Sequence, residues 1–223
     1  MALETIAQLS LSRSQIDRLG ERLRRGTIIE SDLRLLDEYR SSFDSAYKTV
    51  IHTISRTLRK RPSGRPRKTV DSIVAKLNRE TIRLSQMQDI AGCRLVVRDL
   101  GVQERMVRKL LAALPESTAI DRRQRPTHGY RAVHVIAVFG GKPIEIQIRT
   151  KLQDLWAQLS EKMADALGKD LKYGGGPEEE RRLLDLLSEG IKRVEIGKQN
   201  QVESGQLKRL RSTVLKLLKE LIE

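Results

Sequence analysis

The chain of 223 residues has one cysteine, three histidines and an aromatic content of 3%. A single cysteine excludes a disulfide framework, and three scattered histidines give little support to a structural zinc site. No apolar run approaches the roughly 18 residues needed to span a bilayer, and the N-terminal segment lacks the basic and apolar regions of a secretion signal. We therefore expect a cytoplasmic protein that does not enter a membrane.

Positive charge is abundant instead. Lys and Arg number 43 against 29 Asp and Glu, which gives a formal net charge of +14. Such an excess predicts an anionic partner. The few aromatic residues argue against a platform on which single-stranded bases stack, so phosphate handling is favoured. The alternative is a basic surface that serves only solubility.

Hydrophobic periodicity divides the chain into helices, then strands, then helices. The spacing predicts helices over residues 4–25, 31–59, 69–80, 102–114, 150–167, 178–196 and 206–222. Strands are expected over residues 93–98, 118–122, 131–139 and 143–149, with a hairpin turn at Gly140–Gly141. This order predicts an α+β fold with a small mixed, largely antiparallel sheet, flanked by N- and C-terminal helices.

The segment 56–68 has a different composition, with seven basic residues of thirteen and no acidic one. Its prolines and its glycine prevent a continuous helix, so we expect a basic loop. Three segments of one compact domain are predicted: N-terminal helices (1–60), a core (61–170) and C-terminal helices (177–223).

The strand 143–149 places Glu145, Gln147 and Arg149 on one face, because successive strand residues point to opposite sides. The isoleucines between them form the apolar face. An acid, an amide and a guanidinium in one row suit a metal and a polyphosphate. The alternative is an ordinary solvent-facing strand surface.

Other polar residues flank this strand. His134 lies on the neighbouring strand of the hairpin and is either a core histidine or part of the polar face. The loop 121–130 could place a tyrosine ring on a base while arginines hold phosphates. Asp89 precedes a buried strand and is either a metal ligand or a turn residue. A P-loop is excluded, because its sequence pattern is absent.

Four blocks together resemble the synthetase domain of the RelA/SpoT family, in its single-domain small alarmone synthetase form. The blocks are Lys68–Lys76, Gln88–Arg94, His128–His134 and Ile144–Thr150. The resemblance implies a nucleotidyltransferase-like fold and a Mg²⁺-dependent transfer of the β,γ-pyrophosphate of ATP to the ribose 3′-hydroxyl of GDP or GTP, which releases AMP.

The resemblance also implies roles for individual residues. Asp89 and Glu145 would be the metal carboxylates, and Glu145 would act as the base toward the 3′-hydroxyl. The ATP phosphates would contact Arg65, Arg67, Lys68, Ser72, Lys76 and Arg94. The acceptor nucleotide would contact Arg122, Arg123, Arg125, Tyr130, His134, Gln147 and Arg149, with Tyr130 stacked on the guanine.

Two departures from the family pattern leave questions open. Pro66 occupies the place of a basic residue of the ATP site, so either flanking arginine is a candidate for that contact. The acceptor loop has His128 where the family commonly has Asn, and its basic residue is displaced by one, so the choice of acceptor stays open. The net charge of +14 keeps the 3′ end of tRNA as an alternative acceptor. A non-catalytic RNA-binding module is the second alternative. An apolar stripe in helix 206–222 predicts packing on the chain's own core or contact with a second subunit.

Overall fold

The computed structural model describes residues 11–199, together with residues 205, 209, 212–213, 215–216 and 220. The first nine helices and strands, apart from one 3₁₀ helix, run up to the first strand of the hairpin. They are α1 (Arg13–Arg25), α2 (Glu30–Ser41), α3 (Asp44–Leu58), β1 (Ser63–Arg65), α4 (Val70–Arg79), β2 (Ala91–Val97), α5 (Leu100–Ala113), β3 (Ser117–Asp121) and β4 (Val133–Phe139). The later elements are β5 (Lys142–Thr150), α6 (Lys151–Leu167) and α7 (Glu178–Gln199). Two short 3₁₀ helices, η1 (Leu84–Gln86) and η2 (Lys169–Tyr173), complete the described elements.

The five strands form one sheet in the order β1-β2-β5-β4-β3. β2 and β5 are parallel, and the other three pairs are antiparallel. β4 and β5 are joined by a turn at Gly140 and Gly141, both of which have positive φ. The predicted α+β class and the largely antiparallel mixed sheet are therefore confirmed.

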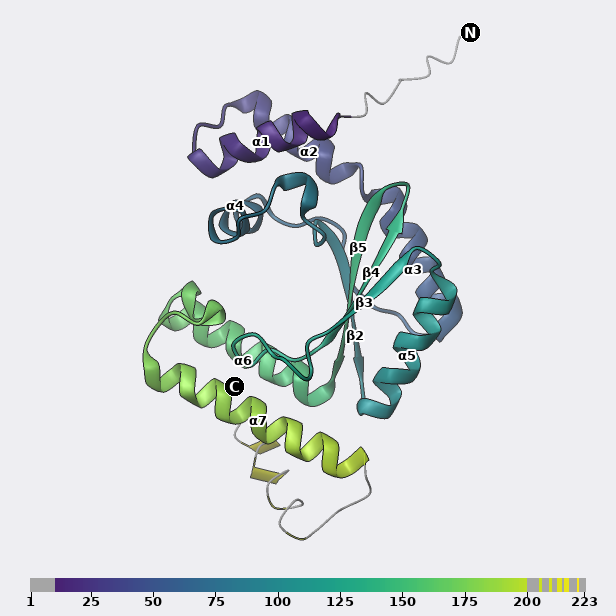
Figure 1. Cartoon of the computed structure of the whole chain (residues 1–223), viewed down its shortest axis with the longest axis vertical. Helices are drawn as coiled ribbons and strands as arrows, with labels where there is room; N and C mark the ends of the chain where they lie inside the picture. The colour runs from purple at the N-terminus through teal and green to yellow at the C-terminus, as the bar shows by residue number, and fades with distance from the viewer. Residues whose placement is uncertain are drawn as a thin grey trace.

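Helices α3 and α5 cover one face of this sheet (Figure 1). The main hydrophobic core lies between them and the strands, and it includes Val50, Ile54, Leu110, Cys93 and Ile146. The same core extends to α1, α2, α4 and η1, which pack together beyond the end of the sheet. Burial of this apolar surface fixes the strands from behind.

The opposite face of the sheet meets α6, which packs against α7 and η2 (Figure 1). A second hydrophobic cluster centres on Trp156, Leu184 and Ile191. The Trp156 indole also donates a hydrogen bond to the carbonyl of Leu184, which ties α7 to α6. Part of the polar sheet face remains uncovered beside this cluster, and it carries the candidate site.

The single helix predicted over residues 31–59 is wrong, since α2 and α3 are separate helices. Ser42 and Phe43 keep nearly helical backbone angles, so the apolar periodicity continues through the break. The Ser42 hydroxyl donates to the carbonyl of Tyr39, and Phe43 is buried edge-on against the Tyr39 ring. The predicted basic loop also contains a short strand, β1, whose pairing with β2 places Gly64 against the Tyr47 hydroxyl.

The remaining predicted elements are present with small shifts of their ends. Residues 4–10 of the predicted first helix lie outside the described residues, as does most of the predicted helix 206–222 with its apolar stripe. In the part of the chain that is described, no helix is both long enough and apolar enough to cross a membrane.

Candidate active site

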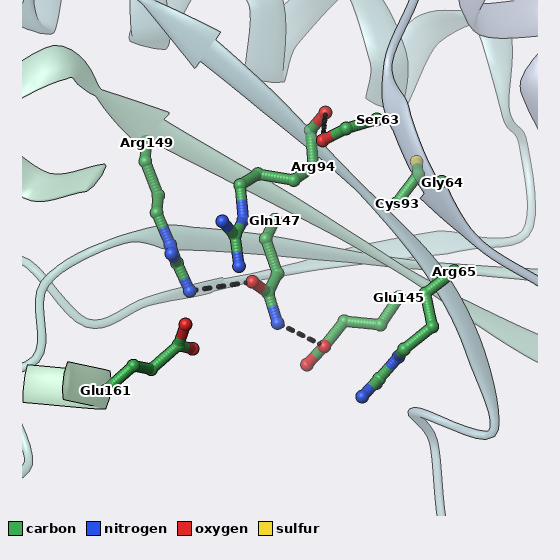
Figure 2. A pocket seen from close by; sticks show the side chains of 10 residues that line it. Ser63, Gly64, Arg65, Cys93, Arg94, Glu145, Gln147, Arg149 and Glu161 are labelled. Atoms are coloured by element: carbon green, nitrogen blue, oxygen red, sulfur yellow. Dashed lines mark hydrogen bonds between the residues drawn. The ribbon is translucent and has the colours of Figure 1, made fainter. Parts of the chain in front are cut away.

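The polar face of β5 is organised by a chain of hydrogen bonds. Arg149 Nη2 donates to Gln147 Oε1 over 2.9 Å, and Gln147 Nε2 donates to Glu145 Oε2 over 2.7 Å (Figure 2). The three isoleucines of the strand are fully buried on the other face. The predicted division of this strand into an apolar and a polar face is confirmed.

His134 lies beside Gln147 on the adjacent strand, in the cross-strand register of β4 and β5. Its Nδ1 is 2.9 Å from Glu145 Oε1, and its Nε2 is hydrogen-bonded to the Tyr130 hydroxyl over 2.9 Å. Arg149 also donates to that hydroxyl. His134 is thus part of the polar face and orients the Glu145 carboxylate.

Glu145 is held in its ionised form. Burial raises the pKa of this carboxyl. The interactions with His134 and Gln147 lower the pKa by more than burial raises it, so the pKa lies below its usual value. Burial raises the pKa of the Tyr130 hydroxyl, against the opposing effect of Arg149. At neutral pH the site therefore presents a carboxylate that accepts hydrogen bonds beside a protonated phenol.

A second cluster surrounds Asp89. Lys68 Nζ and Lys76 Nζ are 2.7 and 2.9 Å from its carboxylate oxygens, and Arg65 Nη2 is 3.8 Å away. Burial raises the pKa of Asp89, but the two lysines outweigh burial and bring it to about 2. Burial also lowers the pKa of Lys68. Three cations around one carboxylate leave an excess of positive charge for an anionic ligand.

The two clusters are neighbours across the sheet. Arg65, Gly92 and Glu145 form one cross-strand row, and Arg94, Gln147 and His134 form the next. The charge of Asp89 raises the pKa of Glu145, opposing the effect of His134. Gly92 is required here, because a Cβ would lie 2.7 Å from the Glu145 carbonyl oxygen.

These rows line a cavity of about 250 Å³ (Figure 2). Its lining residues are Ser63, Gly64, Arg65, Gly92, Cys93, Arg94, Glu145, Gln147, Arg149 and Glu161. Arginines and carboxylates dominate this surface, as expected for a charged, polar ligand that has phosphate groups.

The structure separates the two arginines that flank Pro66. Arg67 donates to both carboxylate oxygens of Asp44, at 3.1 and 2.5 Å. Arg65 instead lines the cavity, with a side chain that is 46% exposed. Arg65 is therefore the better placed candidate for an ATP contact. Ser72 is exposed on α4, where its hydroxyl accepts a hydrogen bond from Thr69.

Arg122 and Arg123 in the loop 122–130 form contacts outside the Glu145 and Asp89 clusters. Arg123 is bound to Asp121 and to Glu104, and Arg122 contacts the Thr127 hydroxyl at 3.4 Å. Arg125 is exposed. Tyr130 is linked to Glu145 through His134. Among the described residues, no hydrogen bond or ion pair links Arg122, Arg123 or Arg125 to Glu145, so the role of these arginines in acceptor binding stays a prediction. His128 and Gly129 have positive φ and form the turn that delivers Tyr130.

Asp154 on α6 is a site residue that the sequence reasoning missed. Its Oδ1 is 3.3 Å from Arg94 Nη1 and 3.2 Å from Arg149 Nη1, so it joins the guanidinium groups of two strands. The signal was present: Asp154, Gln158 and Glu161 recur at four and three residues and so share one helix face. Thr150 is the N-cap of α6 and fixes where that face begins.

The donor set fits a magnesium ion. Among the described residues there is no group of three or more His, Cys, Asp or Glu side chains that could hold a metal alone. Mg²⁺, however, is usually bound by one or two carboxylates together with phosphate oxygens of a substrate. Glu145 supplies one such carboxylate in the lining of the cavity, and Asp89, whose oxygens contact Lys68 and Lys76, is the candidate for the second.

Residues 64–165 match the model of the region found in RelA / SpoT proteins. All four blocks of the predicted resemblance lie inside this match. This segment of the chain therefore resembles that region of the RelA / SpoT proteins. The uncharacterized proteins Rv1366 of Mycobacterium tuberculosis and Mb1401 of Mycobacterium bovis are each 42% identical to the chain over 116 residues, which is 50% of this chain and 42% of each relative. The chain thus matches less than half the length of these relatives.

Solved structures share the fold at lower identity. The small alarmone synthetase 1 of Bacillus subtilis, bound to its product pppGpp, is 22% identical, with a TM-score of 0.54 over 72% of this chain and 94% of that one. A GTP pyrophosphokinase family protein of Streptococcus pneumoniae is 21% identical, with a TM-score of 0.56 over 82% and 98%. The small alarmone synthetase 2 of B. subtilis is 23% identical, with a TM-score of 0.55 over 77% and 100%. The fold is that of the small alarmone synthetases.

Proposed function

We propose that the chain is a pyrophosphokinase that transfers the β,γ-pyrophosphate of ATP to the ribose 3′-hydroxyl of GDP or GTP. The observation that carries this proposal is the ionised, buried Glu145 beside a cationic cavity. A carboxylate that is oriented by His134 and Gln147 is suited to accept a proton from a hydroxyl. The match of residues 64–165 to the region found in RelA / SpoT proteins supports the same reaction class.

In the proposed reaction, the 3′-oxygen of the acceptor attacks the β-phosphorus of ATP. The bond between that phosphorus and the oxygen bridging it to the α-phosphate breaks, and AMP leaves with the bridging oxygen. Glu145 accepts the proton of the 3′-hydroxyl. Such a transfer depends on positioning and charge neutralisation more than on covalent chemistry by the protein.

The cations of the cavity have separate tasks in this scheme. Arg65, Lys68 and Lys76 neutralise the phosphates of ATP from the Asp89 side. Arg94 and Arg149 approach from the other side, where Asp154 fixes their guanidinium groups. Mg²⁺, when bound by Asp89 and Glu145, would neutralise further phosphate charge and orient the leaving group.

The decisive experiment follows the label of γ-labelled ATP in the presence of Mg²⁺ and purified protein. GDP, GTP and deacylated tRNA are offered separately, and Glu145→Gln is the inactive control. Label on the guanosine nucleotide is the expected result. Label on tRNA alone would show that tRNA, and not a guanosine nucleotide, is the acceptor. The net charge of +14 is the observation that favours tRNA as the second candidate acceptor. No label on any acceptor would overturn the proposed activity and favour the non-catalytic RNA-binding module.

A further inference from the structure

A cationic surface lies on the side of the sheet opposite the cavity. It is formed by the outer faces of α3 and α5, which pack side by side over the back of the sheet (Figure 1). Its members are exposed lysines and arginines of these two helices and of the cap of α3: Lys48, Arg56, Arg59, Arg105, Arg108 and Lys109. We call this set the α3–α5 cationic face.

Acidic residues are few near this face: Asp44 lies four residues before Lys48 on α3, and Glu104 lies four residues before Arg108 on α5. No Asp or Glu occurs between residues 45 and 70, or between residues 105 and 115. Within the described part of the chain, none of the six cations takes part in an ion pair, whereas the cations of the cavity are held by Asp89 and Asp154. Six cations against these two carboxylates leave the face with an excess of positive charge, which attracts an anionic partner.

The side chains that the face lacks indicate which class of anionic partner it binds. None of the large apolar side chains that are exposed in the described residues lies on α3 or α5. The face thus lacks the apolar residues with which an amphipathic helix enters a membrane surface. It also lacks exposed aromatic rings on which unpaired bases would stack. What remains is contact with a phosphate backbone.

The geometry favours a double helix. Residues 48, 56 and 59 recur at intervals of eight and three, so they form one stripe that extends about 16 Å along the axis of α3. The stripe on α5 runs beside it, at the roughly 8–10 Å typical of packed helices. Two rows of cations at this spacing suit the phosphates on both sides of the wide, shallow minor groove of an RNA helix. The minor groove of B-form DNA is narrower, at roughly 6 Å.

We propose that the α3–α5 cationic face binds the phosphate backbone of double-helical RNA without sequence preference. The binding would hold the protein on RNA while leaving the cavity on the other face of the sheet open to nucleotides. The bound RNA is therefore a tether or an effector and is distinct from the acceptor that reacts. This proposal does not depend on the pyrophosphokinase activity.

The test measures fluorescence anisotropy of a labelled 20-bp RNA duplex of arbitrary sequence at several salt concentrations, with the full chain. The face variant combines Lys48→Gln, Arg56→Gln and Arg108→Gln. The matched control combines Arg13→Gln, Arg18→Gln and Arg182→Gln, which removes the same charge from exposed positions that have no ion pair among the described residues. Circular dichroism and thermal unfolding verify that both variants fold.

Loss of three phosphate contacts should lower the salt slope of log K by about 3 and weaken binding roughly 100-fold near 0.15 M salt. The control variant should bind within about threefold of the unmodified protein. Equal weakening in both variants would show that net charge alone drives binding, and it would overturn the assignment to this face. Equal or tighter binding of duplex DNA or of single-stranded RNA would overturn the assignment to an RNA helix. Binding to vesicles of anionic phospholipid, without binding to RNA, would establish a membrane as the partner instead.

Discussion

Replacement of Glu145 by Gln separates the chemical role of this residue from its structural role. Gln keeps the shape of Glu145 but cannot accept a proton from a hydroxyl. It can present its single carbonyl oxygen to His134 or to Gln147, but not to both. The side-chain amide of Gln147 cannot exchange its oxygen and nitrogen positions. Its oxygen accepts a hydrogen bond from Arg149, and a guanidinium group can only donate. We therefore expect the loss of at most one hydrogen bond, about 1 kcal/mol, because Nδ1 of His134 can accept from the new amide only in the other imidazole tautomer.

That loss corresponds to a decrease of roughly 2–4 °C in the melting temperature for a chain of this size. The rate of pyrophosphate transfer should fall much further, by roughly 10²–10⁴-fold, since general-base catalysis contributes about that much. Melting temperature and single-turnover transfer from labelled ATP are measured on the same preparations. The matched control is Glu161→Gln, which removes one carboxylate charge from the same cavity and should keep the rate within about threefold. A Glu145→Gln variant with unchanged turnover would refute the proposed base.

Two further predictions concern the carboxylates that hold the cavity's cations. Asp154→Ala should release Arg94 and Arg149 from their shared partner; we expect a roughly tenfold higher KM for a nucleotide substrate with a smaller change in kcat, measured in steady-state assays. Asp89, with its pKa lowered to about 2, should contribute about 2 kcal/mol of stability at neutral pH. This contribution is present above its ordinary pKa near 4 and is lost as the pH falls through about 2. Urea unfolding between pH 5 and pH 2 should therefore show a steeper loss for the unmodified protein than for Asp89→Asn, and equal slopes would contradict the assigned ion pairs.

The sequence predicted the polar strand face because β alternation is a local property. Once residues 143–149 form a strand with one buried face, Glu145, Gln147 and Arg149 must share the other. The hairpin then brings His134 to the same face, which made its neighbourhood predictable as well. These relations depend only on short separations in the chain and on a two-residue turn.

Relations that depend on tertiary packing were not predictable in the same way. Asp154 joins Arg94 and Arg149 only because α6 crosses the polar face at one particular angle. Arg67 is drawn away from the cavity by Asp44 on α3 and Asp37 on α2, which lie 23 and 30 residues earlier, whereas Arg65 contacts Asp89. The break between α2 and α3 preserves the apolar periodicity, so no local signal marks it.

The positive charge of the protein falls into two groups that differ in solvation. Lys68 and Arg149 are buried in the site and paired with Asp89 and Asp154, so salt screens them weakly. The cations of the α3–α5 cationic face are exposed and unpaired among the described residues, so salt screens them strongly. Raising salt from 50 to 200 mM should therefore change the KM for ATP by less than about threefold, while affinity for duplex RNA falls by at least roughly 100-fold. Parallel losses of both would show that the two groups of charge act on one ligand, and the separation of cavity and cationic face would then be wrong.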